Sequence, residues 1–308
     1  MAEMQVTLGN TTLRNPVVLA AGTCGVMGEI KDAINLKNIG AIITKSITQE
    51  PRIGNDPVRI ATLKGGMLNA IGLANEGVDS FIKNQSTKAA ALNTTVIGSI
   101  AGDCIDAYVS VANAMNSVDG IELVEVNVSC PNTSDGLEFG GCPKRLATLL
   151  TEVKQVLTNK GMIVKLSAAP GDIRPHAASA IHSGADALTL INTIPSLAID
   201  VETKRTKISR GVGGASGAMI HPVAVRVVHD VYRDVAKDAN IPIIGTGGTM
   251  HWKDAAEFIL AGASAVGIGT ASFVNPSIAP NIANKLTDWV ARQGCKSISE
   301  LVGSFSLQ

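Results

Sequence analysis

The residues best suited to chemistry lie in one short run, NVSCPN, at positions 127–132. Its amides and hydroxyl offer directional hydrogen bonds, and a free thiol has a pKa of about 8.5, so its thiolate is a minority species at neutral pH. The run ends an apolar segment in which Glu125, Asn127 and Ser129 alternate with valines, which places these three side chains on one face of a strand. Because an unpaired buried amide costs about 1–3 kcal/mol, we expect Asn127 to bind a ligand or a polar partner.

Two lysines stand inside otherwise apolar strand patterns, Lys45 near the end of one and Lys165 within another. A lysine in such a position can extend its stem outward and keep its ammonium group in water. Two lysines that face the same end of the fold instead favour a cationic site. Asn192 and Thr193 add a polar pair after a third strand pattern, and Asn69 lies in a turn-rich segment, where an asparagine can also serve only the local turn.

Glycines follow the last two strand patterns, as Gly247-Gly248 and Gly269-Thr270. Glycine lets backbone N–H groups approach an anion closely, and barrels often bind phosphate in the loops after strands seven and eight. Either glycine turn alone also fits a plain tight turn. The two together predict a ligand that carries a phosphate, and residues 213–217 are a candidate for a further wall of that site.

Eight short apolar runs must position these residues. They begin at Pro16, Gly40, Thr94, Ile121, Met162, Ala187, Pro242 and Ala265. Helical stripes separate them, such as residues 146–157 and the stripe after Pro222. Eight strand–helix alternations in about 250–300 residues are typical of one α/β architecture, the (β/α)8 TIM barrel. A doubly wound open sheet is the rival, but its GxGxxG turn is missing after the first strand pattern.

Two additions decorate the predicted barrel. We expect an N-terminal β-hairpin that turns at Gly9-Asn10, and a small hairpin insertion over the barrel mouth between Ala198 and Gly214. No linker or composition break divides the chain, so residues 1–308 are expected to form a single domain. The chemistry of a barrel lies at the C-terminal ends of its strands, where the polar residues above are found.

Composition excludes several function classes. The 26 basic residues balance the 26 acidic ones, which gives no attraction to nucleic acid or to an acidic membrane surface. No uninterrupted apolar block of membrane-spanning length is present, and the first residues do not resemble a signal peptide. The 5 cysteines never form a CxxC pair and the 5 histidines lack ligand spacing, so neither a disulfide framework nor a metal or iron–sulfur site is expected on this chain. We expect the histidines on solvated faces instead. These features favour a cytoplasmic enzyme.

Together the motifs resemble the class 1 dihydroorotate dehydrogenases. The resemblance runs in chain order through Lys45-Ser46, residues 69–73 (NAIGL), residues 127–132 (NVSCPN), Lys165, Asn192-Thr193 and the two glycine turns. The NxSCPN run is the most specific of these motifs. Residues 66–73 (GMLNAIGL) are most similar to class 1B, the NAD-linked catalytic subunit.

The resemblance implies one FMN per chain, bound across the barrel mouth. Its phosphate would lie on Gly217, Gly247, Gly248, Gly269 and Thr270. Its ring and ribityl chain would be lined by Ala21, Gly22, Lys45, Ser46, Ser99, Asn127, Lys165 and Ile191. The family commonly has Asn where this chain has Ser99, so a hydroxyl would replace part of an amide's hydrogen bonding. Lys165 would stabilise the negative charge that flavin reduction creates.

The resemblance also implies the substrate, dihydroorotate, and its oxidation to orotate in de novo pyrimidine biosynthesis. The substrate contacts would come from Lys45, Asn69, Ile71, Gly72, Leu73, Asn127, Asn132, Asn192 and Thr193. Cys130 matches the catalytic base of the family, which removes the C5 proton while a hydride passes from C6 to flavin N5. Closure of the loop 131–141 would exclude water during this step.

For class 1B the resemblance further implies a partner subunit that carries FAD and a [2Fe–2S] cluster and passes electrons to NAD⁺. The assembly would be a heterotetramer built around a homodimer of this chain. Three alternatives remain: a fumarate-dependent class 1A enzyme, a flavin domain like that of dihydropyrimidine dehydrogenase, and a Schiff-base lyase. A barrel with a strand lysine and a phosphate site also fits the lyase, but that assignment leaves the NVSCPN run unexplained.

Overall fold

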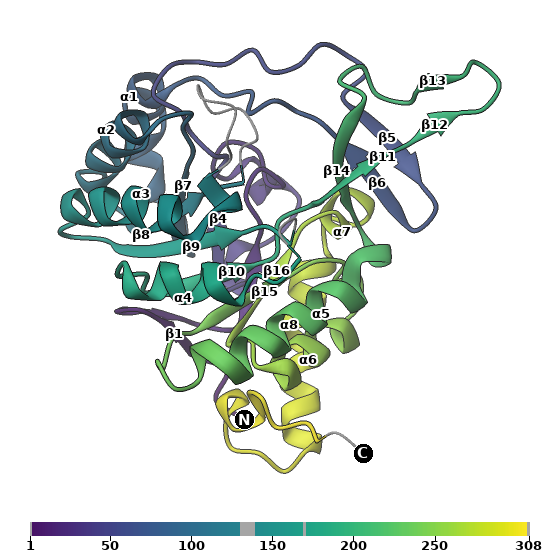
Figure 1. Cartoon of the computed structure of the whole chain (residues 1–308). Coiled ribbons are helices and arrows are strands. Elements are labelled where there is room, and N and C mark those ends of the chain that lie inside the picture. Colours follow the sequence, from purple (N-terminus) through teal and green to yellow (C-terminus); the bar gives the residue numbers. More distant parts are fainter. Residues whose placement is uncertain (1, 130–138, 169–170, 307–308) are drawn as a thin grey trace.

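The computed structural model describes residues 2–129, 139–168 and 171–306, and its centre is a closed barrel of eight parallel strands (Figure 1). In chain order the strands are β3 (Val17–Leu19), β4 (Ala41–Ile43), β7 (Thr95–Ile100), β8 (Ile121–Asn127), β9 (Gly161–Leu166), β10 (Ala187–Leu190), β15 (Ile243–Thr246) and β16 (Ala265–Ile268). Each pairs with the next, and β16 closes the barrel by pairing with β3. All eight predicted runs are therefore confirmed as barrel strands. Their continuous Val, Ile and Leu content suits strands that are covered on both faces.

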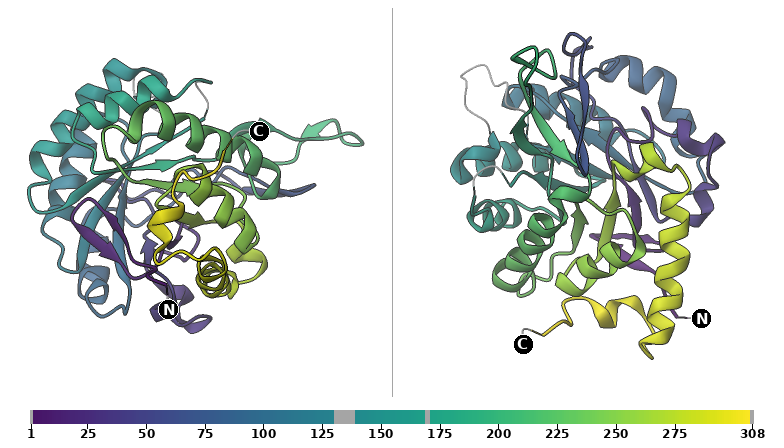
Figure 2. Two further views of the ribbon diagram at one scale, coloured as in Figure 1. Left: turned by 90° about the horizontal axis from the view of Figure 1, so that it is seen from below. Right: turned by 90° about the vertical axis from the view of Figure 1, so that its right-hand side faces the viewer.

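Helices form the outer layer of the barrel (Figure 2). They are α1 (Val78–Ala89), α2 (Ile105–Asn116), α3 (Pro143–Val156), α4 (Arg174–His182), α5 (His221–Val231), α6 (Trp252–Ala261), the short α7 (Ala271–Val274) and α8 (Ile278–Arg292). After β3 the segment contains 3₁₀ turns at Glu29–Asp32 and Leu36–Asn38 where a full helix would complete the alternation. A turn of π-helix, Tyr232–Ala236, continues α5.

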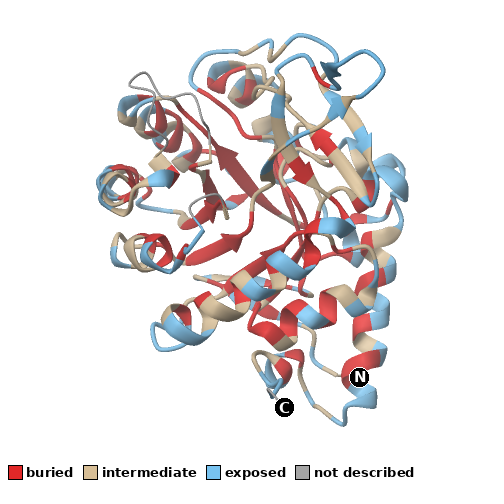
Figure 3. Ribbon diagram, turned by 45° about the vertical axis from the view of Figure 1, so that its right-hand side comes forward, coloured by how far each residue is buried: buried red, intermediate tan, exposed pale blue. Residues whose placement is uncertain are grey.

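The helical stripes read from the sequence face the barrel. In α3 the buried residues are Leu146, Leu149, Leu150 and Val153, which recur at helical spacing on one face. In α5 Pro222 occupies the first turn, where its missing N–H costs nothing. Figure 3 shows the consequence, with buried residues concentrated in the strands and on the inward faces of the helices.

The N-terminal hairpin is confirmed as β1 (Val6–Leu8) paired antiparallel with β2 (Thr11–Leu13). Gly9 takes a left-handed φ of +56° at the turn and packs against Asp186, directly before β10. Leu8 and Leu13 are fully buried in the core. The hairpin therefore lies at the N-terminal end of the barrel, opposite the mouth.

The insertion over the mouth is larger than the sequence indicated. A four-stranded antiparallel sheet contains β11 (Ile194–Leu197), β14 (Val212–Ser216), β6 (Gly66–Asn69) and β5 (Ile60–Leu63), in that order. Within the predicted hairpin, β12 (Ile199–Asp200) and β13 (Arg205–Thr206) pair as a separate two-stranded sheet. The β5–β6 hairpin was not predicted, and the segment at Asn69, expected to be turn-rich, is instead a strand because β14 supplies strand partners from far along the chain.

Candidate active site

A cavity of about 890 Å³ lies between the barrel mouth and this four-stranded sheet. That volume falls in the range of about 300–1,000 Å³ typical of small-molecule sites. The residues predicted from sequence that line it are Ala21, Gly22, Lys45, Ser46, Asn69, Ile71, Gly72, Leu73, Asn127, Lys165, Ile191, Asn192, Thr193, Gly217, Gly247, Gly248, Gly269 and Thr270. Cys130 and Asn132 lie outside the residues that the structure describes.

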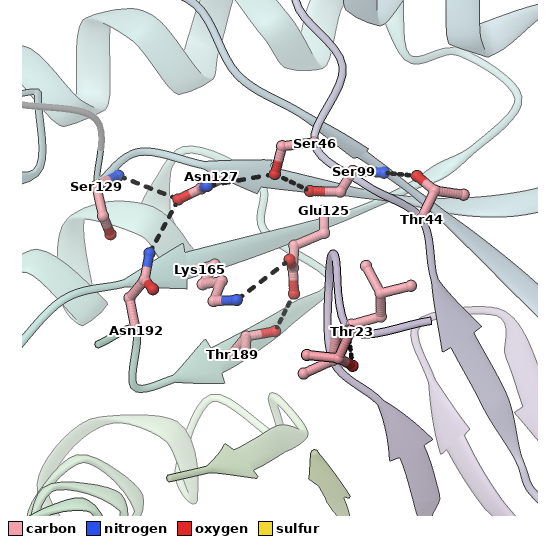
Figure 4. A network of polar contacts seen from close by, with 12 residues as sticks. Thr23, Thr44, Ser46, Ser99, Glu125, Asn127, Ser129, Lys165, Thr189 and Asn192 are labelled. Carbon is pink, nitrogen blue, oxygen red and sulfur yellow. Dashed lines mark hydrogen bonds and ion pairs between the residues drawn. The ribbon is translucent and has the colours of Figure 1, made fainter. Parts of the chain in front are cut away.

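Asn127 is the centre of a hydrogen-bond network at the C-terminal end of β8 (Figure 4). Its Nδ2 donates to Ser46 Oγ at 3.3 Å, and its Oδ1 accepts from Asn192 Nδ2 at 3.2 Å and from the Ser129 backbone N–H at 3.3 Å. The Tyr108 hydroxyl donates to the Asn127 carbonyl oxygen at 2.7 Å, which fixes the backbone at the same point. The amide plane of Asn127 is thus oriented from several sides before any ligand binds.

Ser99 lies one layer behind this network. It is fully buried, and its hydroxyl lies 2.9 Å from the hydroxyl of Ser46, which does line the cavity. Its backbone N–H donates to Thr44 Oγ1 at 2.9 Å. Ser99 does not line the cavity. The geometry therefore does not support the direct contact with a bound ligand that we expected from its side chain. A serine is shorter than the Asn that the family commonly carries, and the effect of Ser99 on a ligand must pass through Ser46.

Lys45 and Lys165 both point into the cavity rather than outward between the helices. Lys165 is only 7% exposed, and its Nζ lies 3.8 Å from Oε1 of the buried Glu125. Burial, reinforced by the positive charge of Lys165, lowers the pKa of Lys45 below the ordinary lysine value. The outward alternative for the two lysines is therefore excluded. Two largely buried cations, of which only Lys165 lies near a carboxylate, leave a cavity that favours an anionic ligand.

The opposite side of the mouth is built from glycines. Gly247 and Gly248 have φ of +142° and +71°, and Gly217 has φ of +102°. A Cβ on Gly248 would lie 2.7 Å from the Gly217 carbonyl oxygen, so the two turns touch through backbone alone. A Cβ on Gly269 would meet no atom closer than 3.9 Å, because this residue borders open space. Backbone lines this side of the cavity, as an anion site requires.

His221 supports the glycine side and was missed by the sequence analysis, which placed the histidines on solvated faces. Its ring is buried edge-on against Phe258, with Nδ1 2.9 Å from the Gly247 carbonyl oxygen and Nε2 3.2 Å from Glu257. The one available signal was its position next to the first-turn Pro222, directly after the expected glycine wall.

Residues 69–74 form the upper wall of the cavity. Asn69 Nδ2 donates to the Gly214 carbonyl oxygen at 3.2 Å, which ties β6 to β14. Gly72 and Leu73 both have left-handed φ, +75° and +55°. Asn75 serves the local turn: its side chain bonds Thr48, the Leu73 carbonyl and the Gly77 N–H. Asn69 and Asn75 therefore have different roles despite their similar sequence setting.

Several buried hydroxyl groups in the cavity wall are suited to hydrogen-bond a ligand. Ser129 Oγ, Thr246 Oγ1 and Thr249 Oγ1 are buried, line the cavity and have no hydrogen-bond partner within the part of the chain that the structure describes. Buried hydroxyls normally find partners. The two threonines flank the Gly247-Gly248 turn, and Thr270 on the other turn bonds Ser216 Oγ at 2.8 Å. Donors, cations and glycine turns of this kind fit a polar flat ring that carries a phosphate, as FMN does.

Of the described cysteines, Cys24 fits a structural role. Cys24 is buried beneath the cavity wall, and burial raises the pKa of its thiol to about 12. No disulfide joins the cysteines that the structure describes. Among the same described residues, no cluster of three His, Cys, Asp or Glu side chains could hold a metal ion.

Comparison with known proteins identifies the family. A family model described as "Dihydroorotate dehydrogenase" matches residues 3–290. The chain belongs to the dihydroorotate dehydrogenase family. The resemblance drawn from its motifs is therefore confirmed, and the dihydroorotate dehydrogenase family is known for FMN-dependent oxidation of dihydroorotate in pyrimidine biosynthesis.

Relatives within the dihydroorotate dehydrogenase family match along the whole chain. The protein named "Dihydroorotate dehydrogenase B (NAD(+)), catalytic subunit" from Bacteroides thetaiotaomicron is 42% identical over 308 residues, covering 100% of both chains. Proteins of the same name from Desulforudis audaxviator and Trichlorobacter lovleyi are 42% and 43% identical, covering 97% and 98% of this chain and 96% and 98% of theirs. These names agree with the class 1B resemblance.

A solved structure supports the fold. The dihydroorotate dehydrogenase of Eimeria tenella in complex with ferulenol superposes with a TM-score of 0.79 at 22% identity, over 98% of this chain and 88% of that one. At this identity the likeness supports only the barrel architecture. In the described part of this chain, no helix has the length and apolar character needed to cross a lipid bilayer.

Proposed function

We propose that this chain oxidises dihydroorotate to orotate with one bound FMN, and that electrons then pass to NAD⁺ through a partner subunit. The observation that carries the proposal is the Asn127 network, placed beside two buried lysines and opposite two glycine turns in one cavity. Family membership and the names of the full-length relatives support the same reaction.

The glycine side of the cavity suits the FMN phosphate. Gly247, Gly248, Gly269 and Thr270 present backbone and a hydroxyl there, and Gly217 lets β14 approach closely. Ala21, Gly22, Ser46 and Ile191 would line the ring, in the cavity between β3, β4 and β10. When bound, FMN supplies the hydride acceptor that none of the twenty amino-acid side chains provides.

The lysines supply the electrostatics of the site. Lys165, held at the cavity wall, places a fixed positive charge where reduction creates negative charge, and a cation already in position costs no reorganisation. Lys45 lines the same cavity and suits the carboxylate of the substrate. Water is restricted at both ammonium groups because both lysines are largely buried, which strengthens these interactions.

The amides orient the substrate ring. Asn127 and Asn192 are already bonded to each other, so their polar edges share one fixed orientation toward the cavity. Asn69 approaches from the upper sheet, with Thr193 and the backbone of residues 71–73 beside it. Asn132 joins this set by its place in the NVSCPN run. Directional contacts of this kind select a flat ring with alternating donors and acceptors.

Cys130 is proposed as the base. Removing the C5 proton of dihydroorotate leaves its electron pair to form the C5=C6 double bond as the hydride leaves C6. The thiolate accepts that proton, and the two hydrogens lost give orotate. The position of Cys130, three residues beyond Asn127 in the chain, supports this role, because Asn127 lines the cavity. A cytoplasmic setting, which we also propose, would keep the thiol reduced.

The names of the relatives support a partner subunit. Their shared name specifies NAD⁺ and a catalytic subunit, and we propose that the second chain carries FAD and a [2Fe–2S] cluster. We propose a heterotetramer formed by a homodimer of this chain and two partner chains. The cysteines described here are scattered over the fold, and no cluster of them is available for iron–sulfur ligation among the described residues.

Replacing Cys130 tests the chemistry. Cys130→Ala should abolish flavin bleaching by dihydroorotate, while the protein keeps its yellow colour because FMN remains bound. Cys130→Ser should retain slow turnover, most impaired at low pH, because a hydroxyl is a poorer base. Stopped-flow absorbance of the flavin measures both variants. Turnover near the unmodified rate in Cys130→Ala would remove this residue as the base.

The electron acceptor is tested separately. The isolated chain should not reduce NAD⁺, and activity should appear once the partner subunit is added. Rapid reduction of fumarate by the isolated chain would instead indicate the class 1A reaction. A colourless protein that borohydride inactivates in the presence of its substrate would indicate a Schiff-base lyase.

A further inference from the structure

A carboxylate is buried in the barrel directly under the candidate site. Glu125 belongs to β8, two residues before Asn127, and is 0% exposed. It does not line the cavity, so no ligand bound there explains it. A buried carboxylate is costly unless it is paired and hydrogen-bonded. The presence of this charged group inside the barrel therefore needs a reason.

Two neighbouring strands supply its partners (Figure 4). From β10, Thr189 Oγ1 donates a hydrogen bond to Glu125 Oε2 at 2.9 Å. From β9, Lys165 Nζ lies 3.8 Å from Glu125 Oε1, which has no hydrogen-bond partner among the described residues. The register pairs Lys165 with Thr189 on one side and with Asn127 on the other. Lys165 thus stands between the carboxylate and the cavity.

The two lysines of the cavity differ in whether a carboxylate lies close to their ammonium groups. Within the described residues, Lys165 has a carboxylate within ion-pair distance, whereas Lys45 has none. The charged groups that face Lys165 are Glu125 from β8 and Lys45 beyond the end of β4. The ammonium of Lys165 is therefore held from below, and part of its positive field is cancelled by a negative charge close behind it.

We propose that Glu125 is a positioning residue for Lys165: it holds the ammonium group of Lys165 from behind the cavity wall, and by offsetting part of that positive charge it lowers the reduction potential of the bound flavin. This inference rests on the proposed function, because it requires FMN beside Lys165. Flavin reduction adds negative charge to the ring. A cation nearby favours that change and an anion nearby opposes it, with a strength that falls with distance.

Three substitutions in this buried layer should have three different effects on the flavin potential: a rise, a fall and no change. Glu125→Gln keeps the shape and an acceptor for Thr189 but removes the negative charge, so the potential should rise. Lys165→Met removes the positive charge, so the potential should fall. Thr189→Val is the matched control, because it removes a hydrogen bond in the same layer and leaves both charges in place. Its potential should stay close to that of the unmodified protein.

The measurement is the midpoint potential of the FMN-loaded protein, determined by dye-linked titration. The first two variants should each shift the ratio of affinities for reduced and oxidised FMN by about tenfold or more, which is about 30 mV for a two-electron couple. The double variant Glu125→Gln/Lys165→Met should lie between the two single variants. A purely structural role would move all three single variants in one direction, which would overturn the proposal, as would a lower potential in Glu125→Gln.

Should Glu125→Gln fail to fold, Glu125→Asp provides the same test. Its carboxylate is withdrawn by one methylene from Lys165, so we expect a smaller rise of the potential. A value at or below that of the unmodified protein would overturn the proposal. Failure of the proposed function has a different signature: the unmodified protein would bind no FMN at all, whereas failure of this inference would leave FMN bound with an unchanged or lowered potential in the Glu125 variants.

Discussion

The two sides of the barrel mouth are built by different means. On the side of β8, β9 and β10, side chains form the wall, and Asn127, Asn192 and Lys165 hold one another or buried partners in place. On the side of β15 and β16, glycines form the wall, and backbone meets backbone between Gly248 and Gly217. The first side offers oriented amides and a cation, whereas the second lets a ligand approach the backbone closely.

This difference matches what each side has to recognise. A flat ring with donors and acceptors at fixed angles needs side chains that cannot rotate freely, and a network of mutual hydrogen bonds provides that rigidity. A phosphate is nearly symmetric and needs several N–H groups close together, which residues without a Cβ permit most readily. The variants below test this difference between the two sides of the mouth.

The largest effect is expected on the glycine side. Gly248→Ala forces a left-handed residue to carry a Cβ, at a cost of about 1–3 kcal/mol. It also places that Cβ 2.7 Å from the Gly217 carbonyl oxygen and 2.8 Å from His221 Cβ. We expect FMN binding to be lost and the melting temperature to fall, as measured by flavin fluorescence and calorimetry.

Gly269→Ala is the matched control for that prediction. Its Cβ would enter open space, so the fold and the melting temperature should be unchanged. FMN affinity should still fall, because the methyl group occupies the cavity, whereas riboflavin, which lacks the phosphate, should bind as before. Equal losses for FMN and riboflavin would show that this turn does not hold the phosphate.

A smaller effect is expected from the amide network. Asn127→Ala removes the hydrogen bonds to Ser46, Ser129 and Asn192 together. At about 1 kcal/mol for each bond, kcat/KM for dihydroorotate should fall on the order of 100-fold. Steady-state kinetics measures this loss. Ser99→Ala, which changes only the layer behind Ser46, should cost less than about fivefold, and an equal loss in both variants would contradict the arrangement described here.

The smallest effect concerns Lys45 and the pH. Burial lowers the pKa of Lys45, so its charge is lost at a lower pH than that of an exposed lysine. Since Lys45 is positive only below its pKa, orotate should bind more weakly as the pH rises through the alkaline range. Titration of the flavin absorbance with orotate at several pH values measures this trend.

Variants of Lys45 make the trend specific. In Lys45→Met, orotate affinity should be about tenfold lower near neutral pH and should lose this pH dependence. In Lys45→Arg, binding should persist to higher pH, because a guanidinium stays charged. An unchanged pH dependence in Lys45→Met would assign the titration to another group.

Much of the fold could be predicted from local pattern. Eight apolar runs with helical stripes between them specify a barrel, because each run is too short to be a helix and each stripe buries only one face. The hairpin at Gly9-Asn10 followed from turn chemistry alone. The β5–β6 hairpin could not be predicted in this way, since its strands are short and partly exposed and are stabilised by pairing with β14.

In the candidate site, too, local sequence pattern predicted some features and missed others. Apart from Ser99, every predicted site residue that the structure describes lines the cavity, from Ala21 to Thr270. The residues behind the cavity wall could not be identified from the sequence. Ser99 was expected at the ligand but lies behind Ser46, and His221 was expected on the surface but supports Gly247.

The amino-acid sequence by itself therefore determined the barrel, the family and the chemical groups available at its mouth, because strand alternation and turn residues act over a few neighbouring positions. Only the tertiary structure decided which groups touch the ligand space and which stand behind those that do. The pairing of Glu125 with Lys165 and Thr189 is one such decision. It depends on how three strands are staggered around a closed barrel, and that stagger is a property of the whole sheet rather than of any one strand.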